Sequence, residues 1–314
     1  MVQIRSVSDN FLIAQIMQKF LLRSLCLLLF ISCQKPIEKT DNIDDPSVNY
    51  GSLFIYQGDY SNLGSTREIS ELVAGHDVAV FTHGFTLSGE DWVNGHCLDV
   101  AFDSLASVIL QVRDVNPDIE IYGYVTATAD HPLGCWPQPS VQLETCEDGI
   151  CTDFIFWTNK WLSMEYANPE VQIDGIFVDL VNEVLISPLV RDNCFSYVKL
   201  ANKRLFVNAL SDSAGVAFAL ESTHLDSNDM LLVEGYQQIA GHENLQTVAI
   251  ERLVAGASTR WSAIVSETYG ADINCTNENF RNALARFDSL GGTSITYQAA
   301  DLGTITGTWS SCLE

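Results

Sequence analysis

The chain has 314 residues and a formal net charge of −24 at pH 7, because 40 aspartates and glutamates outnumber 16 lysines and arginines. Proteins that bind nucleic acid use basic patches to displace counterions, so this balance argues against a nucleic-acid partner. Attraction to a cationic ligand is one interpretation of the acidity, and solubility or a saline habitat is the other.

The first 33 residues are predicted to be an export signal rather than part of the fold. Residues 21–32 form a short apolar run that follows the basic residues Lys19 and Arg23. The small residue Ser32 ends this run and stands directly before Cys33. A basic start, a short apolar core and a small residue at the cleavage point are typical of a secretory signal.

The cysteine at the end of this signal predicts a lipid anchor. Residues 30–33 (FISC) resemble a bacterial lipobox, in which the cysteine is acylated and becomes the new N-terminus. We therefore predict lipidation at Cys33 and an exported lipoprotein on the bacterial outer membrane or cell surface, which touches the membrane through this anchor only. An uncleaved hydrophobic anchor and an ordinary signal are the alternatives. Translation from Met17 instead of Met1 would give a more compact signal.

The rest of the chain is predicted to be a tether followed by one folded domain. Residues 34–50 are polar and contain two prolines, which is typical of a flexible tether. Residues 51–314 show no second linker, and their length suits one large domain. Residues 1–32 carry a net charge of +2, so the portion from Cys33 onward carries −26.

Nine cysteines are present, and seven remain when Cys26 of the signal and Cys33 are set aside. The seven are Cys97, Cys135, Cys146, Cys151, Cys194, Cys275 and Cys312. Disulfides persist outside the cytoplasm, so some are expected to pair, while the odd number leaves at least one free. A zinc site at Cys146-x4-Cys151 is the rival interpretation. No C-x2-C pair exists and the six histidines are scattered, so neither a metal nor a cofactor is predicted.

Eight short runs of β-branched, aromatic and other apolar residues recur along the folded part. The runs are Leu53–Tyr56, Val78–Thr82, Ile119–Val125, Ile173–Asp179, Leu205–Ala209, Met230–Glu234, Ala263–Ser266 and Ser294–Gln298. Most are nearly continuous in apolar residues, as expected of parallel strands that are buried on both faces. Segments with helical periodicity lie between them: Asp99–Asp114, Phe154–Tyr166, Leu189–Asn202, Leu245–Ala255 and Asn279–Leu290.

This alternation of strands and helices predicts a single closed (β/α)8 barrel of the α/β class. Eight strand–helix units in about 264 residues match the usual length of such a barrel. An open doubly wound sheet is the alternative, but the first run is not followed by the glycine-rich phosphate loop that such sheets commonly carry. The P-loop and G-x-S-x-G patterns are also missing, which weakens nucleotide-binding and serine-hydrolase interpretations.

Two loops that follow the second and third predicted strands carry tryptophan. The long segment Ala129–Asp153 contains Trp136, three prolines and the cysteines at 135, 146 and 151, without a clear period. We expect it to cap the C-terminal rim, where such barrels keep their sites, and to be cross-linked through at least one of these cysteines. Trp92 lies in the shorter loop Gly84–His96. Their polar, turn-rich surroundings favour exposed stacking platforms for both tryptophans over core packing.

Barrels of this kind carry their chemistry on side chains at the C-terminal ends of the strands. Here these positions hold carboxylates, amides and aromatic rings: Tyr56, Tyr124, Asp179, Asn208, Glu234, Tyr236, Glu267 and Gln298. They contain no Ser-His-Asp arrangement and no paired histidines. Glycoside hydrolysis needs only two carboxylates, one as general acid and the other as nucleophile or base. A polysaccharide is therefore the predicted ligand, and no protein partner is implied.

Asp179 and Glu234 are the predicted catalytic pair. Each follows an apolar strand, where a charged group needs a partner or a purpose. Glu234 is the expected proton donor, because partial desolvation raises the pKa of a carboxyl group. Asp179 is expected to stay ionised, with hydrogen bonds from neighbours; a purely structural role is the alternative for both. The residues predicted to bind substrate are Tyr56, Tyr124, Asn208, Tyr236, Glu267, Gln298, Trp136 and Trp92.

Residues 119–236 resemble the spherulin-4 and endo-alpha-1,4-polygalactosaminidase group. Residues 123–125 (GYV) resemble an element of that group's third strand, and residues 174–179 (DGIFVD) resemble the D-G-I-F-x-D element of the fourth. Asn208 and Glu234 match an asparagine on the fifth strand and a glutamate at the end of the sixth. The resemblance implies a glycoside hydrolase barrel that acts on an extracellular polymer of galactosamine or N-acetylgalactosamine.

One position departs from this group, whose spherulin-4 members usually carry Asp-Glu at the end of strand four. This chain has Asp179-Leu180, with the next acid only at Glu183. Three functions therefore stay open: a surface glycoside hydrolase, a barrel that binds glycans without cleaving them, and a structural or adhesive lipoprotein. A deacetylated galactosamine polymer is cationic, which would suit the charge of −26 from Cys33 onward.

The lipobox gives the first testable prediction. We expect the mature protein to begin at an acylated Cys33, which mass spectrometry of membrane fractions should detect. Cys33→Ala should release or mislocalise the protein, because the acyl chains would be its only hold on the bilayer. Recovery of wild-type protein in soluble form and without lipid would contradict this prediction.

Overall fold

The computed structural model of the protein describes residues 51–56, 63–81, 97–128, 146–147, 149–210, 212–234, 236, 245–267 and 278–299. All of them belong to one compact unit, Val48–Glu314. The predicted signal, the lipidation at Cys33 and the whole tether lie outside the described residues, as do Trp92 and Trp136. No helix in this described part is both long and apolar enough to cross a membrane.

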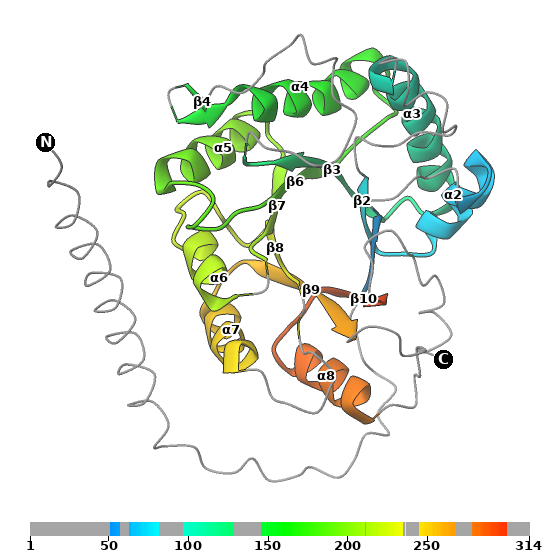
Figure 1. The fold of residues 1–314 in the computed structure, drawn as a ribbon. Helices are drawn as coiled ribbons and strands as arrows, with labels where there is room; N and C mark the ends of the chain where they lie inside the picture. The colour runs from blue at the N-terminus through cyan, green and yellow to red at the C-terminus, as the bar shows by residue number, and fades with distance from the viewer. Residues whose placement is uncertain are drawn as a thin grey trace, which may run out of the picture. The chain divides into compact units, whose positions relative to one another are not determined.

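Eight parallel strands close into a ring (Figure 1). They are β1 (Gly51–Tyr56), β2 (Val78–Phe81), β3 (Glu120–Thr126), β6 (Gly175–Asp179), β7 (Arg204–Asn208), β8 (Met230–Val233), β9 (Arg260–Glu267) and β10 (Ser294–Ala299). Each strand pairs with its neighbours in this order, and β10 pairs back with β1. The predicted single (β/α)8 barrel is confirmed, and all eight predicted runs form its strands.

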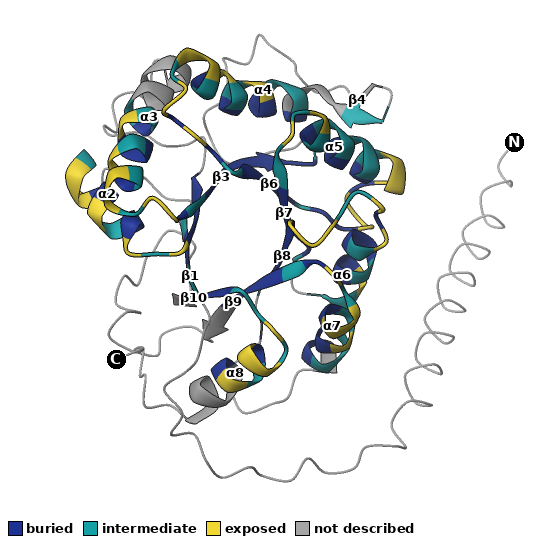
Figure 2. Ribbon diagram, turned by 180° about the vertical axis from the view of Figure 1, so that it is seen from behind, coloured by how far each residue is buried: buried dark blue, intermediate teal, exposed yellow. Residues whose placement is uncertain are grey.

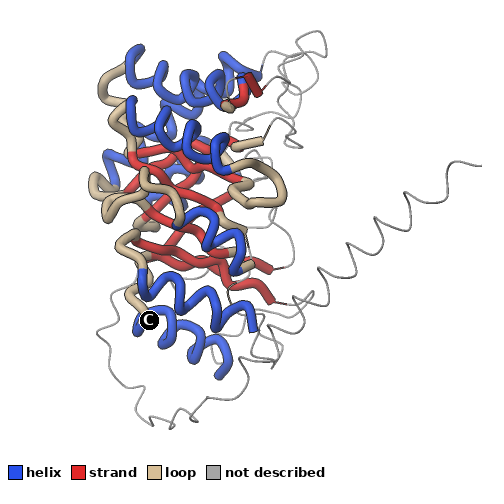
Figure 3. The backbone as a smooth tube through the Cα atoms, turned by 90° about the vertical axis from the view of Figure 1, so that its left-hand side faces the viewer, coloured by secondary structure: helices blue, strands red, loops and turns tan. Residues whose placement is uncertain are grey.

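Helices cover the outside of the ring, as the end-on and side views show (Figures 1 and 3). Those in the described residues are α2 (Thr66–Ala74), α3 (Cys97–Val115), α4 (Thr152–Ala167), α5 (Pro188–Leu200), α6 (Ser213–Leu220), α7 (Leu245–Gly256) and α8 (Glu278–Ser289). Local signals set several helix starts. Ser65 and Glu68 form a capping box at α2, and Ser187 caps α5 directly before Pro188.

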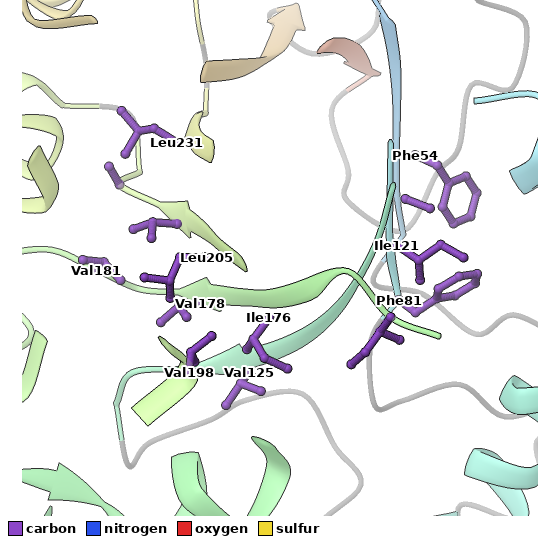
Figure 4. Close-up of a cluster of buried hydrophobic side chains, with 14 of the residues drawn as sticks. Phe54, Phe81, Ile121, Val125, Ile176, Val178, Val181, Val198, Leu205 and Leu231 are labelled. Carbon is purple, nitrogen blue, oxygen red and sulfur yellow. The ribbon is translucent and has the colours of Figure 1, made fainter. Parts of the chain in front are cut away.

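Strand side chains alternate between two buried layers. The inner layer fills the barrel and includes Tyr124 and Phe177, whose stacked rings lie 5.5 Å apart. The outer layer lies between strands and helices and includes Val125 and Val178 (Figure 4). Figure 2 shows the strands as the most buried part of the fold. Because both faces of each strand are covered, the runs are continuous in apolar residues rather than alternating.

Close packing of α4 holds the third strand in place. A Cβ atom at Gly123 would lie 2.2 Å from the ring of Trp161, so this close approach requires glycine. The indole N–H of Trp161 also donates to the carbonyl oxygen of Tyr124 at 3.0 Å. These contacts fix the position of β3, and with it the height at which the Tyr124 side chain enters the barrel.

An ion cluster closes the N-terminal end of the barrel. Arg260 donates two hydrogen bonds to the Glu120 carboxylate, at 2.7 and 2.9 Å, and Arg204 lies 3.2 Å from the same group. The hydroxyl of Tyr122 donates to Glu120 at 2.7 Å. These residues belong to the starts of β3, β7 and β9, so the carboxylate at this end is paired with two arginines. Barrels of this kind carry their active sites at the opposite, C-terminal end.

The loop after β3 contains a short hairpin that the sequence pattern does not predict. β4 (Cys146–Glu147) and β5 (Ile150–Cys151) pair antiparallel, with Cys146 opposite Cys151. Gly149 has a φ of 76° in the turn, and its carbonyl oxygen accepts a hydrogen bond from the side-chain amide of Asn193 on α5 at 3.2 Å. The hairpin thus docks on α5. The rest of the predicted rim loop, Cys135 included, lies outside the described residues.

The register of this hairpin predicts a disulfide between Cys146 and Cys151. Directly opposed residues in an antiparallel pair have Cα atoms about 4.5 or 5.5 Å apart, and both values suit a disulfide. An exported thiol–disulfide oxidant would accept the two electrons and two protons that the thiols lose. Peptide mapping without reduction should then find the two cysteines joined.

Cys194 supplies the control for that experiment, because it is buried and free. After denaturation without reductant it should react with an alkylating agent, whereas Cys146 and Cys151 should react only once a reductant is added. Alkylation of all three cysteines in unreduced protein from an oxidising compartment would contradict the predicted bridge.

Candidate active site

Three neighbouring strands bring polar side chains together at the C-terminal end of the barrel. Asp179 ends β6, Asn208 ends β7, and Glu234 directly follows β8. The three strands are consecutive in the ring (Figure 1). Because parallel strands end at the same rim, residues that lie far apart in sequence become neighbours here. The structure therefore brings both predicted catalytic carboxyl groups to one place, with Asn208 between them.

A single nitrogen atom joins the two carboxyl groups. The side-chain Nδ2 of Asn208 donates to Oδ1 of Asp179 at 2.6 Å and to Oε1 of Glu234 at 2.7 Å. Asn208 is only 1% exposed, so water does not compete freely for these bonds. An amide nitrogen carries two hydrogens, and each is used for a different carboxyl group. Asn208 was predicted to bind substrate, but its donors are directed at the two acids instead.

Asp179 receives more hydrogen bonds than Glu234. Besides the bond from Asn208, its Oδ1 accepts from the backbone N–H of Leu180 at 2.7 Å, and its Oδ2 accepts a short bond from the hydroxyl of Tyr124. Tyr124 extends from β3 inside the barrel and is itself buried. Tyr124, which was also predicted to bind substrate, therefore donates its hydrogen bond to Asp179 from inside the barrel. Among the described residues, Glu234 accepts a side-chain bond from Asn208 alone.

Two leucines adopt left-handed backbone conformations next to these acids. Leu180 has a φ of 61° and Leu210 a φ of 62°. Leucine rarely occupies this region, and each case costs about 1 kcal/mol or more. The turns let the N–H of Leu180 reach Asp179 and the N–H of Leu210 reach Oδ1 of Asn208 at 3.0 Å. The strained backbone at Leu180 and Leu210 thus helps to position the side chains of Asp179 and Asn208.

Burial, with no ion pair to a described lysine or arginine, sets the electrostatics of the two carboxyl groups. Burial raises the pKa of Asp179, and the bonds from Tyr124, Leu180 and Asn208 oppose that rise. The pKa of Glu234 is raised to about 7 by burial and by the charge of Asp179, while the Asn208 bond opposes the shift. Burial and the charge of Asp179 also raise the pKa of Tyr124, so its hydroxyl stays protonated and keeps donating.

Tyr236 does not join this group, which corrects its predicted role in substrate binding. Its ring is 1% exposed and packs against Trp261 and Phe287 in the layer between strands and helices. Its hydroxyl donates to Glu251 on α7 at 2.9 Å. The backbone N–H of Tyr236 donates to the carbonyl oxygen of Ile264 of β9 at 2.9 Å, which helps to hold the ring in this outer layer.

The other residues predicted to bind substrate are placed only in part. Tyr56 is the last residue of β1, Glu267 the last of β9, and Gln298 lies near the end of β10. Their backbones therefore reach the rim that carries Asp179 and Glu234, while their side chains lie outside the description. Trp92 and Trp136 fall outside the described residues altogether.

The groups described beside the two carboxyl groups are hydrogen-bond donors rather than further metal ligands. In the described ranges, no three His, Cys, Asp or Glu side chains come together as a metal-binding group. Asn208 is a potential third oxygen ligand beside the two carboxyl groups. However, its Oδ1 is engaged by Leu210, and its N–H donors point at the acids. A cation between the carboxyl groups would face these donors, so the arrangement suits acid–base chemistry.

Comparisons with known proteins give the fold and no closer relationship. No family model matches the chain, and no curated protein matches it. An intracellular xylanase from Thermoanaerobacterium saccharolyticum is similar in structure with a TM-score of 0.50 and 12% identity, over 82% of this chain and 90% of that one. A GH10 protein from Paenibacillus barcinonensis gives 0.51 and 10% identity, over 85% and 90% of the two chains. The chain shares their barrel fold.

The raised pKa of Glu234 predicts a stability that depends on pH. The folded state holds this proton more tightly than the unfolded chain, so the stabilisation is complete below about pH 4.5 and is lost as the pH rises through about 7. Between about pH 5 and 8, wild type should lose on the order of 2 kcal/mol of unfolding free energy relative to Glu234→Gln. Denaturant unfolding at both pH values measures this difference.

An exposed glutamate on the same rim is the control for this measurement. Glu183→Gln changes a glutamate in the loop after β6, so the variant should follow wild type at both pH values. Equal pH dependence in wild type and Glu234→Gln would contradict a buried, protonated Glu234.

Proposed function

We propose that the protein is a glycoside hydrolase in which Glu234 is the general acid and Asp179 the partner carboxylate. The observation that carries the proposal is the buried pair of carboxyl groups bridged by one Asn208 nitrogen. Two acids in environments that separate their proton affinities are what such hydrolysis requires. The pKa of Glu234, about 7, suits a group that must donate a proton near neutral pH.

The unequal supply of hydrogen bonds assigns the two roles. Three donors reach Asp179, from Tyr124, Leu180 and Asn208, and hydrogen bonds to a carboxylate favour its ionised form. Among the described residues, Glu234 has only the donor of Asn208, so we place a single proton held by the pair on Glu234. Asp179 is then the ionised group that attacks or stabilises the sugar carbon.

The closeness of the two acids supports a retaining mechanism. Two oxygens that accept from the same nitrogen at 2.6 and 2.7 Å can be no more than about 5 Å apart. Retaining enzymes hold their carboxyl groups about 5–5.5 Å apart, whereas inverting enzymes leave about 6.5–9.5 Å for a water molecule. Hydrolysis with net retention of the anomeric configuration is therefore the expected stereochemistry.

The proposed reaction has two steps. Glu234 gives its proton to the glycosidic oxygen as the bond to the anomeric carbon breaks, and Asp179 bonds to that carbon. Glu234, now ionised, then takes a proton from water, whose oxygen attacks the carbon and releases Asp179. One water molecule is consumed and Glu234 regains its proton. Before Asp179 bonds to the sugar and after its release, the neutral donors of Tyr124 and Asn208 hold its carboxylate in place.

The substrate we propose is an extracellular polymer of galactosamine or N-acetylgalactosamine. Support comes from the spherulin-4 and polygalactosaminidase motifs around Asp179 and Glu234 and from the net charge of −26 that follows the signal. A lipid anchor at Cys33 would hold the enzyme outside the cytoplasm, where such a polymer lies. The fold shared with a xylanase is compatible with this chemistry but does not indicate the sugar.

The catalytic assignment predicts that either acid is essential. Asp179→Asn and Glu234→Gln keep the shape of the side chain but remove the ionisable group. If the wild type cleaves galactosaminoglycan oligomers, each variant should lose about a hundredfold or more in kcat while circular dichroism stays native. Glu183→Gln, an exposed change on the same rim, should keep the wild-type rate.

Two results would contradict the catalytic roles assigned to Asp179 and Glu234. Undiminished cleavage by Asp179→Asn or Glu234→Gln would remove that residue from the mechanism. A wild-type protein that binds these oligomers without cleaving any glycan would support the second candidate, a glycan-binding lipoprotein. The Leu180 that stands where spherulin-4 relatives usually carry glutamate favours testing binding and cleavage side by side.

A further inference from the structure

The amide of Asn208 is held in one orientation. Its Oδ1 accepts the N–H of Leu210 at 3.0 Å, a turn in which a side-chain oxygen binds the backbone two residues on. The carbonyl oxygen of Leu210 accepts the N–H of Glu234 at 3.1 Å, which ties this turn to the end of β8. A flip of the amide would break the first bond and turn the oxygen towards two acids. Both N–H donors must therefore face the carboxyl groups.

This locked amide gives the same donor to both acids, so it does not create their difference by itself. The difference comes from Tyr124 and Leu180, which bind Asp179 alone. The role of Asn208 is to keep Asp179 and Glu234 at a fixed separation in which the charge of one acts on the other. If the amide were absent, each buried carboxyl group would lose a donor, and no described side chain would link the two acids.

Among the described residues, the groups beside the pair are neutral or already hydrogen-bonded to other partners. Tyr124 of β3 is a neutral donor with a raised pKa. In the neighbouring loop, Asp212 accepts bonds from the side chain of Asn182 and from the N–H of Gly215. Within the described part of the chain, the ion pairs of lysine and arginine are made with other acids, not with Asp179 or Glu234. Asn208 is thus the one side chain there that binds both.

We propose that Asn208 is a positioning residue that holds Asp179 and Glu234 at one fixed separation and donates one hydrogen bond to each of them. It does so as a fixed double donor rather than as a residue that binds substrate. The consequence for catalysis rests on the proposed glycoside hydrolase function, but the effect on the proton can be measured without any substrate.

The chemistry of the position explains why asparagine is required there. Aspartate has nearly the same shape and can accept from the N–H of Leu210, but it would present a third carboxyl group to the pair. Leucine has a similar volume and offers no donor. Both changes remove the two N–H bonds while filling the space, so neither simply opens a cavity for water. They therefore separate loss of the donors from loss of packing.

The test is a titration of Glu234 by carbon-13 NMR of its carboxyl group in the full folded domain. In Asn208→Leu and Asn208→Asp, the midpoint of Glu234 should rise by about one pH unit or more, because a bond that favours the ionised form is lost. Asn182→Leu is the matched control. It removes another buried asparagine of this rim, whose side chain reaches Asp212 instead, and it should leave the midpoint unchanged.

The result that would overturn the proposal is a Glu234 midpoint that stays the same or falls in both folded Asn208 variants. A shift of equal size in Asn182→Leu would also overturn it, because the effect would then be general loosening of the rim. Thermal unfolding and circular dichroism identify folded variants. Asn208→Ser, which keeps one donor, supplies an intermediate shift if the larger changes prevent folding.

An activity measurement separates this inference from the proposed function. If the protein cleaves a glycan, the basic limb of kcat/KM reports the ionisation of the free enzyme's acid. In Asn208→Leu this limb should move to higher pH together with the NMR midpoint, while kcat falls. A lower rate with an unmoved limb would indicate a structural role only. If wild type cleaves nothing, the proposed function fails, and the titration alone still decides the role of Asn208.

Discussion

Two buried carboxyl groups bound to one amide nitrogen form the constraint on which the candidate site depends. Like charges at this distance in a poorly solvated place cannot both ionise readily near neutral pH. The pair therefore holds a proton that a solvent-exposed carboxylate would have lost. The closed barrel makes the arrangement possible, because only neighbouring parallel strands end at one rim with their side chains this close.

At the opposite end of the barrel, a buried glutamate is paired with arginine, and its pKa changes in the other direction. Burial there would raise the pKa of Glu120, but the bonds from Arg260 and Tyr122 outweigh it and the pKa falls. At the mouth, Glu234 is also buried but has Asp179 and a neutral amide beside it, and its pKa rises. The pKa of one buried carboxyl group is thus lowered by its partners, and the pKa of the other is raised by its surroundings.

Much of this arrangement could be predicted from the sequence, because apolar runs locate strand ends. Asp179, Asn208 and Glu234 each close such a run, and the parallel order puts them on one rim. Tyr236 was wrongly predicted to lie at the mouth, since its ring lies in the outer layer with Trp261 rather than inside the barrel. The left-handed turn at Leu210 has no sequence signal, because leucine does not favour that conformation.

The side chains that donate to the two acids, Asn208 and Tyr124, carry no charge. A lysine or arginine in place of Asn208 would bind both carboxyl groups more strongly, but it would lower both pKa values, as Arg260 does for Glu120. Neither acid would then keep a proton near neutral pH. Burial raises the pKa of Asp179, and the bonds from Tyr124 and the Asn208 amide oppose that rise, while the pKa of Glu234 stays raised despite its bond from Asn208. An uncharged donor at position 208 is therefore needed if the two carboxyl groups are to stay close together and Glu234 is to keep its proton.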